Sequence, residues 1–557
     1  MPPRKSRVGN LAAPAGGLSR VSGFLDRVVE AVAPARAAKR AAARAAMAAF
    51  SRGGVAHHAA RSDRLKGNWA VTSGSPDEDN LPELEIVRER SRDLNRNDGH
   101  AAGVTGAIVD NVIGTGIRPQ SRADASLLEV SDDATAAWAK TAERAWRRWS
   151  PWADAADRMS LEEIQGLAER QVLENGEVFI LPVRVAGPGR PYSLALDVVE
   201  ADRVKTPNEH IGNDRVRDGI EVGDRGEPVA YWVRKDHPGD LTVGRWNMSN
   251  SASNYWRIPA RNSFGQRNVY HVYWLRRPGQ TRGFPFFGPV IRLFKDLGDY
   301  FEAEIVAARI AACFALFINK NDPAGAVIGA TERTQEGKRI GEIQPGLIEY
   351  LGMGESVSQV NPARPGSNFD AFVTRCLKAI SAGCGLPYEV VARDYSQTNY
   401  SSARAALLEA RRMFAARQTL HVVRWLHLTW QLLIEEAYLA GDFGALAAPG
   451  VTDRWEDWTR ATWIPQGWSW VDPEKEARAA GLAMQNGLST LADEAAAQGR
   501  DWEEVLAQQA REAARRQDLG LPPAPTSAPA PTAPAPAPEV PDDPVVKRGV
   551  GASAGGA

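Results

Sequence analysis

Cysteine is scarce in this chain, which has three cysteines in 557 residues. Three cysteines are too few for a disulfide framework, and Cys376 and Cys384 lack the spacing of metal ligands. Cys313 lies in an apolar run with helical spacing, where a thiol behaves as a small apolar side chain. The sequence therefore predicts synthesis in a reducing, cytoplasmic compartment.

The sequence also lacks the short motifs of nucleotide-dependent enzymes. It has no Gly-x-x-x-x-Gly-Lys-Ser/Thr loop, which excludes a P-loop ATPase, and Gly114-Thr-Gly116 lacks the third glycine of a dinucleotide-binding turn. Asp442-Phe-Gly444 spells a kinase triplet, but neither a glycine-rich loop nor a His-Arg-Asp loop accompanies it. The eight histidines form no His-x-x-x-His pair. We therefore predict no catalytic residues, no bound metal and no cofactor.

Long apolar runs and a large net charge are absent as well. The most apolar stretch, 305–318, is 14 residues long and contains Arg309, which is typical of a core helix and predicts no membrane span. The net charge is −1, yet residues 1–62 contain eleven Lys or Arg and two acidic residues, a local charge of +9. Such an Arg- and Ala-rich arm is typical of an organelle transit peptide, and equally of a basic arm that binds an acidic partner or DNA. Composition alone leaves these alternatives open.

Tryptophan, by contrast, is abundant, with 17 copies that suit a packed core or a subunit interface. The segment Thr135–Trp149 predicts a helix, because its apolar side chains recur on one face. These side chains are Trp138, Ala142, Trp146 and Trp149. Ser160 and Glu163 form the pattern of a capping box, which predicts a second helix that ends near Asn175-Gly176.

The remaining pattern predicts an α+β fold. Residues 177–275 are rich in short β-prone runs separated by Gly, Pro and Asp, with a hairpin turn at 224–228. A polar, Tyr-rich loop is expected at 388–400, and Ser401 or Ser402 should cap a helix that has no Gly or Pro until Gly441, about 57 Å in length. Further helices are expected at 91–112, 283–319, 369–382 and 475–516, and an extended Pro/Ala-rich tail follows from 521.

An ordered set of short segments carries a family resemblance. The segments are Asn95-Arg-Asn97, 107–120 (AIVDNVIGTGIRPQ), 200–204 (EADRV), 219–232, His237-Pro-Gly, 257–260 (RIPA), 277–283 (RPGQTRG), 296–317, 365–370 (PGSNFD), 385–388 (GLPY), 399–409 and 470–476. In this order they resemble the lambda-type portal family of tailed phages, over about residues 65–520. The basic arm and the tail lie outside the resemblance.

The resemblance implies a portal fold, in which about twelve subunits form a ring at one vertex of the capsid. Such a subunit has a peripheral wing, a helical stem around a channel, a clip and a C-terminal crown. The implied divisions are an arm at 1–64, a wing and β-rich region with the clip at 65–280, a stem helix at 281–320, wing strands with a short helix and a tunnel loop at 321–402, a long helix with a Trp-rich segment at 403–473, crown helices at 474–520 and a tail at 521–557.

The resemblance also implies which residues meet DNA in the channel. Stem candidates are Asp296, Asp299 and Glu302, which would repel DNA from the wall; alternatively they face solvent or pair with Arg292 and Lys295. Tunnel-loop candidates are Arg393, Asp394, Tyr395, Gln397, Asn399 and Tyr400. This nearly neutral mixture could touch phosphates without the strong charge pairing that would stall a sliding duplex. Alternatively, the loop merely connects two helices.

The implied partners are further copies of this chain, double-stranded DNA bound without sequence specificity, the terminase large subunit, the major capsid protein and scaffold, and head–tail adaptor proteins. The implied location is the portal vertex of the virion, after assembly in the cytoplasm of the bacterial host. Two alternatives stay open on the residues alone. One is a DNA-processing nuclease of a mobile element, which would need clustered metal-binding carboxylates, and the other is an organelle-targeted structural protein.

Overall fold

The computed structural model describes residues 73–240, 250–312, 316–320, 332–333, 339–340, 355–359, 369–396, 400–446, 451–468, 470 and 472–522. The chain divides into two compact units, Met1–Gly74 and Ser75–Ala557, and nearly every described residue belongs to the second. The expected arm at 1–64 and the tail from residue 523 onward lie outside the described residues.

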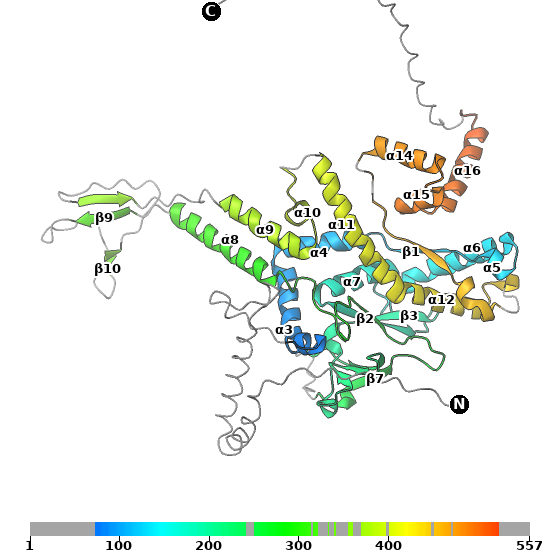
Figure 1. Cartoon of the computed structure of the whole chain (residues 1–557), viewed down its shortest axis with the longest axis horizontal. Helices are drawn as coiled ribbons and strands as arrows, with labels where there is room; N and C mark the ends of the chain where they lie inside the picture. Colours follow the sequence, from blue (N-terminus) through cyan, green and yellow to red (C-terminus); the bar gives the residue numbers. More distant parts are fainter. Residues whose placement is uncertain are drawn as a thin grey trace, which may run out of the picture. The chain divides into compact units, whose positions relative to one another are not determined.

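Helices dominate the second unit, and several begin at a side-chain cap. Ser75, Asp98 and Ser131 each accept a hydrogen bond from a backbone N–H of the first turn, and Ser160 and Glu163 form the predicted capping box. The helices are α3 (Pro76–Asn97), α4 (Gly99–Val112), α5 (Ala125–Leu128), α6 (Asp132–Trp149), α7 (Leu161–Glu174), α8 (Ile291–Ala312), α9 (Phe369–Cys384), α10 (Tyr388–Ala392), α11 (Tyr400–His421), α12 (His427–Leu439), α13 (Trp455–Trp458), α14 (Pro473–Gln485), α15 (Leu491–Ala497) and α16 (Trp502–Asp518) (Figure 1).

The strands form small antiparallel sheets, which confirms the α+β class. One sheet has the order β3-β2-β8 and another the order β4-β5-β6-β7, and the predicted turn at 224–228 lies between β5 and β6. Shorter sheets pair β1 with β13, β9 with β12 and β10 with β11. The strands are β1 (Arg118–Ser121), β2 (Glu177–Arg184), β3 (Leu194–Val199), β4 (Val216–Arg217), β5 (Ile220–Val222), β6 (Pro228–Arg234), β7 (Tyr255–Pro259), β8 (Tyr270–Tyr273), β9 (Leu316–Lys320), β10 (Glu332–Arg333), β11 (Arg339–Ile340), β12 (Glu355–Gln359) and β13 (Ala461–Ile464).

Tryptophans on α6 and α12 form the centre of the main core. The predicted stripe on α6 is confirmed, because Trp138, Ala142, Trp146 and Trp149 are all buried. The indole of Trp138 donates to the carbonyl of Trp458 at 2.9 Å, and that of Trp430 donates to the carbonyl of Thr459 at 2.8 Å. Burying these rings therefore does not leave their N–H groups without acceptors.

Several predicted element boundaries are wrong. The helix expected at 91–112 is two helices, because Asp98 leaves helical geometry to cap α4. The helix expected at 283–319 begins at Ile291 and ends at Ala312, and strand β9 follows. The loop expected at 388–400 begins with helix α10. The segment expected to be helical at 475–516 is helical and is divided into α14, α15 and α16.

The long helix predicted after the loop is present, although it begins at Tyr400 and not after a cap at Ser401 or Ser402. α11 continues through a π-helical turn at Val422–Leu426 into α12, which ends at Leu439. At about 1.5 Å per residue this element is roughly 60 Å long. Along this element α11 packs against α4, Arg417 of α11 pairs with Glu169 of α7, and α12 packs against α6 (Figure 1).

Candidate channel-lining elements

The expected stem helix, α8, packs against α9 through aromatic side chains. The ring of Phe369 stacks on Tyr300 at 5.7 Å between centroids and meets Phe301 edge-on at 5.9 Å. On its other side, Phe301 stacks with His100 of α4 at 6.4 Å. Nearer the body, Phe294 and Leu297 are buried. The first half of α8 is thus fixed to the body and to α9.

The second half of α8 extends beyond the first turn of α9, as Figure 1 shows. Ile305 and Val306 there are 52% and 45% exposed, and Ala308 is exposed as well. By their spacing of three and four residues, Ile305 and Ala308 would continue the apolar stripe of Phe294, Leu297 and Phe301, but within a single chain they are not buried. The physical reason is that α9 begins at Phe369, opposite Tyr300 and Phe301, so it does not cover the positions that follow.

The three acidic stem candidates lie on the solvent side of α8 within the single chain. Asp296, Asp299 and Glu302 are all exposed. Asp299 pairs with Lys295 at 2.6 Å, one of the pairings that the sequence left open, and this contact raises the pKa of Lys295. Because residues three apart in a helix differ by 300° around its axis, the three carboxylates follow a spiral of about 120° rather than a straight line.

The candidate tunnel loop begins with residues that hold one another in place. Arg393 closes α10 in the left-handed conformation, at φ 52°, and donates to the carbonyl of Gly103 on α4 at 3.4 Å. Asp394 accepts from the hydroxyl of Tyr388 at 3.1 Å and from the N–H of Ser396 at 3.0 Å. Hydrogen bonds from the side chain and the backbone of Ser396, and then the one from Tyr388, lower the pKa of Asp394. Tyr395 is 54% exposed.

The remaining three loop candidates are described less fully. Gln397 and Asn399 lie outside the described residues, and Tyr400 is the first residue of α11, although its side chain is not described. The six candidates therefore share one connection between α10 and α11. Arg393 and Asp394 form hydrogen bonds within the chain, so they hold the start of the loop in place in addition to being candidates for contact with DNA.

A buried ion cluster fixes the middle of the long helix. Glu169 of α7 pairs with Arg417 and accepts from Nε2 of His421 at 2.8 Å. Nδ1 of His421 accepts from the indole of Trp425 at 3.0 Å, so the proton of this ring lies on Nε2. Burial alone would raise the pKa of Glu169, but Arg417 and His421 outweigh it and lower the pKa. The π-helical turn starts directly after His421. The cluster therefore fixes the C-terminal end of α11, and the end of α11 next to the loop lies before the fixed residues.

A second buried cluster fixes the chain just before α8, and the sequence did not predict it. Glu177 of β2 pairs with Arg88 of α3 and with Arg282, each at 2.5 Å, and all three side chains are 0–1% exposed. The other oxygen of Glu177 accepts from the N–H of Gly283 at 2.6 Å and contacts His271 of β8 at 2.8 Å. Arg282 and Gly283 belong to the 277–283 motif, but the sequence contains no sign of their contact with Glu177.

The electrostatics of this second cluster follow from its burial. Burial alone would raise the pKa of Glu177, but Arg282 and Arg88 hold it well below its ordinary value. Burial lowers the pKa of His271 despite the nearby carboxylate. A Cβ at Gly283 would lie 2.2 Å from the carbonyl oxygen of Gly176, so this close backbone approach requires glycine. The cluster therefore positions the base of α8.

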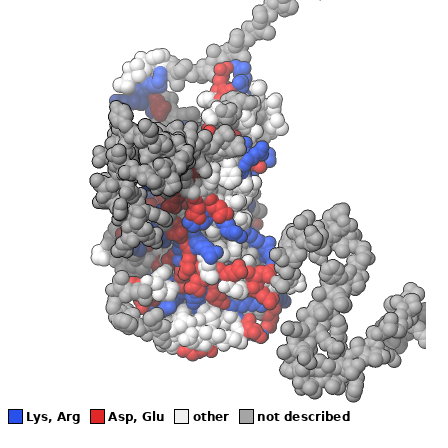
Figure 2. Space-filling model, turned by 90° about the vertical axis from the view of Figure 1, so that its left-hand side faces the viewer, with Lys and Arg blue, Asp and Glu red and all other residues white. Residues whose placement is uncertain are grey.

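On the face drawn in Figure 2, acidic and basic side chains are interspersed. Within the described ranges, no group of three or more His, Cys, Asp or Glu side chains could hold a metal ion. Among the helices described, none combines the length and the apolarity that a membrane crossing requires.

Comparison with known proteins gives consistent matches over most of the chain. Residues 62–418, more than half of the chain, match the family described as "Phage portal protein, lambda family". The probable portal protein of Halomonas phage phiHAP-1 is 28% identical over 480 residues, which cover 83% of this chain and 87% of that protein. The portal protein of Escherichia phage N15 is 28% identical, with 83% and 90% covered, and portal protein B of Escherichia phage lambda is 26% identical, with 82% and 88% covered.

Among solved structures, a chain from the neck of an empty gene transfer agent particle has a TM-score of 0.38 and 12% identity, and the match covers 79% of this chain and 94% of that one. The family match runs from before α3 into α11, so it includes α8 and α9, the candidate tunnel loop and the Glu177 cluster, and it includes Glu169 and Arg417 of the other cluster. This chain belongs to the lambda family of phage portal proteins.

Proposed function

We propose that this portal protein acts as the head–tail connector subunit of a tailed phage and forms a ring of about twelve copies around a channel for double-stranded DNA. The family match over residues 62–418 carries the proposal. A ring also accounts for the exposed apolar residues Ile305 and Val306 on the distal part of α8, because a neighbouring copy would cover them.

In this proposal α8 lines the channel and the α10–α11 connection projects toward the DNA. Two buried clusters support it, because each fixes one of these elements to the body. The Glu177 cluster holds the start of α8, and the Glu169 cluster holds α11 behind the loop. A channel wall needs such rigid bases, since passing DNA would otherwise displace the elements that touch it.

The charge distribution suits a sliding duplex. Each Lys or Arg that pairs with a phosphate adds affinity through counterion release, so a wall with many unpaired cations would hold DNA in one place. The three carboxylates at 296, 299 and 302, repeated by every copy, would present acidic rings to the channel. Tyr395 and the neutral residues of the loop would contact the backbone weakly.

The proposed role is structural and not enzymatic. Its proposed partners are the terminase large subunit during packaging, the major capsid protein and scaffold at the vertex, and head–tail adaptor proteins afterwards. The proposed location is the portal vertex of the virion, with assembly in the bacterial cytoplasm. The α14–α16 segment is the candidate crown, and the sheet β4-β5-β6-β7 lies in the region that would contain the clip.

Mass photometry and negative-stain imaging of the purified protein test the ring. About twelve copies of 60.4 kDa give an expected mass of roughly 0.7 MDa, with a central hole in projection. Monomers or dimers alone, under mild buffer conditions and across a range of concentrations, would contradict the proposal.

A further inference from the structure

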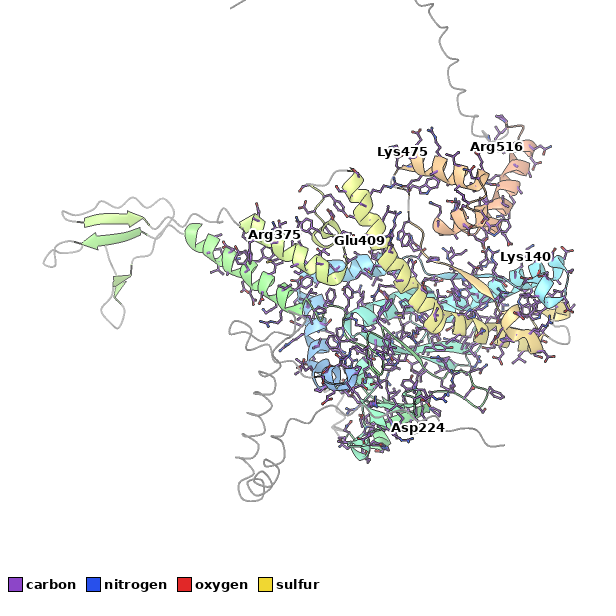
Figure 3. The ribbon with its side chains drawn as sticks, in the orientation of Figure 1. Lys140, Asp224, Arg375, Glu409, Lys475 and Arg516 are labelled. Carbon is purple, nitrogen blue, oxygen red and sulfur yellow. The ribbon has the colours of Figure 1, made fainter. Side chains whose placement is uncertain are left out.

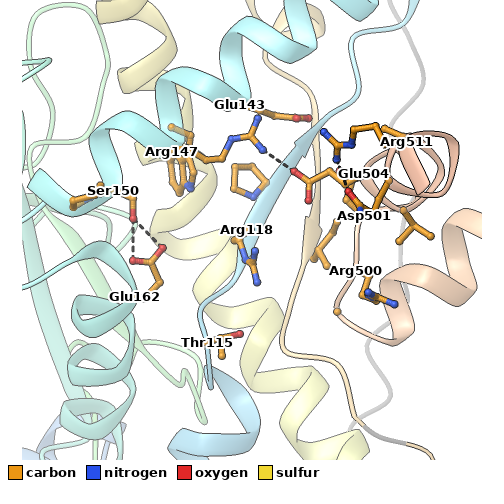
Figure 4. Close-up of a pocket in the computed structure, with 18 residues that line it drawn as sticks. Thr115, Arg118, Glu143, Arg147, Ser150, Glu162, Arg500, Asp501, Glu504 and Arg511 are labelled. Carbon is orange, nitrogen blue, oxygen red and sulfur yellow. Dashed lines mark hydrogen bonds and ion pairs between the residues drawn. The ribbon is translucent and has the colours of Figure 1, made fainter. Parts of the chain in front are cut away.

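A cavity lies where the C-terminal helices meet the body. It has a volume of about 1100 Å³ and is bounded by β1, by the second half of α6 and by the first turns of α16 (Figure 4). Its charged lining residues are Arg118, Glu143, Arg147, Glu162, Arg500, Asp501, Glu504 and Arg511. The family resemblance gave this cleft no role.

The α14–α16 segment depends on the body for its position. Among the side chains described in its three helices, only Ala495 is buried, so the segment has almost no core of its own. Gly467 and Gly499 approach so closely that a Cβ on Gly467 would lie 2.0 Å from the backbone of Gln498, and this contact joins the preceding segment to the turn before α16. Helices of this length gain most of their stability from packing.

The polar contacts across the cleft are few. Gln120 of β1 donates to Asp501 at 2.7 Å, and Asp501 also caps α16. Arg147 of α6 pairs with Glu504 at 2.6 Å, but these side chains are 59% and 62% exposed, so their pairing contributes little. We call this set of contacts across the cleft the seat of the α14–α16 segment.

Glu143 of α6 is a half-buried carboxyl at the seat. It accepts from the N–H of Ser121 at 3.0 Å. Burial raises its pKa to about 7, and the carboxylates of Asp501 and Glu503 on α16 add to this effect, whereas Ser121 and Arg147 oppose it. The cleft also contains Glu504, which is paired with Arg147, and Glu162, which accepts from the hydroxyl of Ser150 at 2.8 Å. Because α16 forms one wall of the cleft that Glu143 lines, removing α16 would open the cleft and take away two acidic neighbours of Glu143.

We propose that proton uptake by Glu143 favours the seated state of the α14–α16 segment and that proton release favours a detached state. The direction of this pH effect follows from the linkage between proton binding and the seating equilibrium. A carboxyl whose pKa is higher in the seated state binds its proton more tightly there, so seating is favoured below the ordinary pKa of glutamate and weakens as pH rises toward about 7. Between pH 6 and pH 8 the seating equilibrium should fall by at most roughly tenfold. The proposal is independent of ring size and of DNA.

Distance measurement between two spin labels on the full chain tests this inference. The labels are placed at the exposed positions Lys140 on α6 and Gln517 on α16, in a chain without its native cysteines. Figure 3 shows Lys140 on α6 and Arg516, the neighbour of Gln517, on α16. Labelled chains are diluted with unlabelled ones, so that distances within one subunit dominate. At pH 6 we expect one narrow distance, and at pH 8 a second, longer and broader population.

Three variants make the test specific. Glu143→Gln keeps an acceptor for Ser121 but cannot release a proton, so it should stay seated at both pH values. Glu503→Gln, at an exposed position, removes a neighbouring charge and should move the transition to lower pH. Glu162→Gln is the matched control in the same cleft and should respond like the unmodified chain. A distance distribution that does not change from pH 6 to pH 8 would overturn the proposal, as would a pH response that persists unchanged in Glu143→Gln.

Discussion

Replacing Glu177 with glutamine should destabilise the base of α8. The amide keeps the size of the side chain and one acceptor oxygen, but it removes the charge that faces Arg88 and Arg282. Both guanidiniums are 0–1% exposed, so water cannot replace the lost carboxylate. Breaking a buried ion pair by removing one partner costs about 3–5 kcal/mol. We therefore expect local opening around this cluster to become at least about a hundredfold more frequent.

Native-state hydrogen exchange at pH 7 measures this opening. Peptides that cover β2 at 177–184 and the chain at 280–297 should exchange faster in Glu177→Gln, while peptides from α6 should change little. Glu504→Gln is the matched control, because Glu504 pairs with Arg147 at the surface, where an ion pair contributes under about 1 kcal/mol. If both variants exchange equally in these peptides, the cluster does not stabilise the base of α8 and the reasoning is refuted.

Three further predictions follow from the same structure. Acidification from pH 7 to pH 5.5 should increase proteolysis at 280–297. Burial lowers the pKa of His271, so in this pH range the opened chain binds a proton that the closed chain does not, and opening becomes more favourable. Cleavage that slows as the pH falls would contradict this prediction. Alanine at Tyr395, Gln397 and Tyr400 together should leave rings intact but reduce DNA packaging or retention, and normal packaging of a full genome would make the loop a mere connector. Deleting residues 1–62 should leave ring formation intact and reduce incorporation into procapsids, whereas loss of cooperative unfolding in the deleted chain would show that the arm belongs to the core.

Local chemistry by itself determined many of the elements. The stripe of tryptophans on α6 and the capping box at Ser160 depend on spacings of three and four residues, so the sequence predicts them without knowledge of the fold. The long helix after the loop was predictable for the same reason, because no Gly or Pro interrupts it. The family resemblance added what local chemistry lacks, the expectation of a portal ring.

Only the tertiary structure decided which of these elements are covered and which charges meet. Ile305 fits a core stripe by spacing, yet it is exposed because α9 begins too late to cover it. Glu177 and Arg282 are 105 positions apart, and nothing at either position indicates the other; they meet because β2 and the turn before α8 cross at Gly176 and Gly283. The protonation of Glu143 likewise depends on burial and on two carboxylates of α16, about 360 residues further along the chain. Spacing in the sequence predicts contacts within one element, whereas contacts between elements depend on how the whole chain packs.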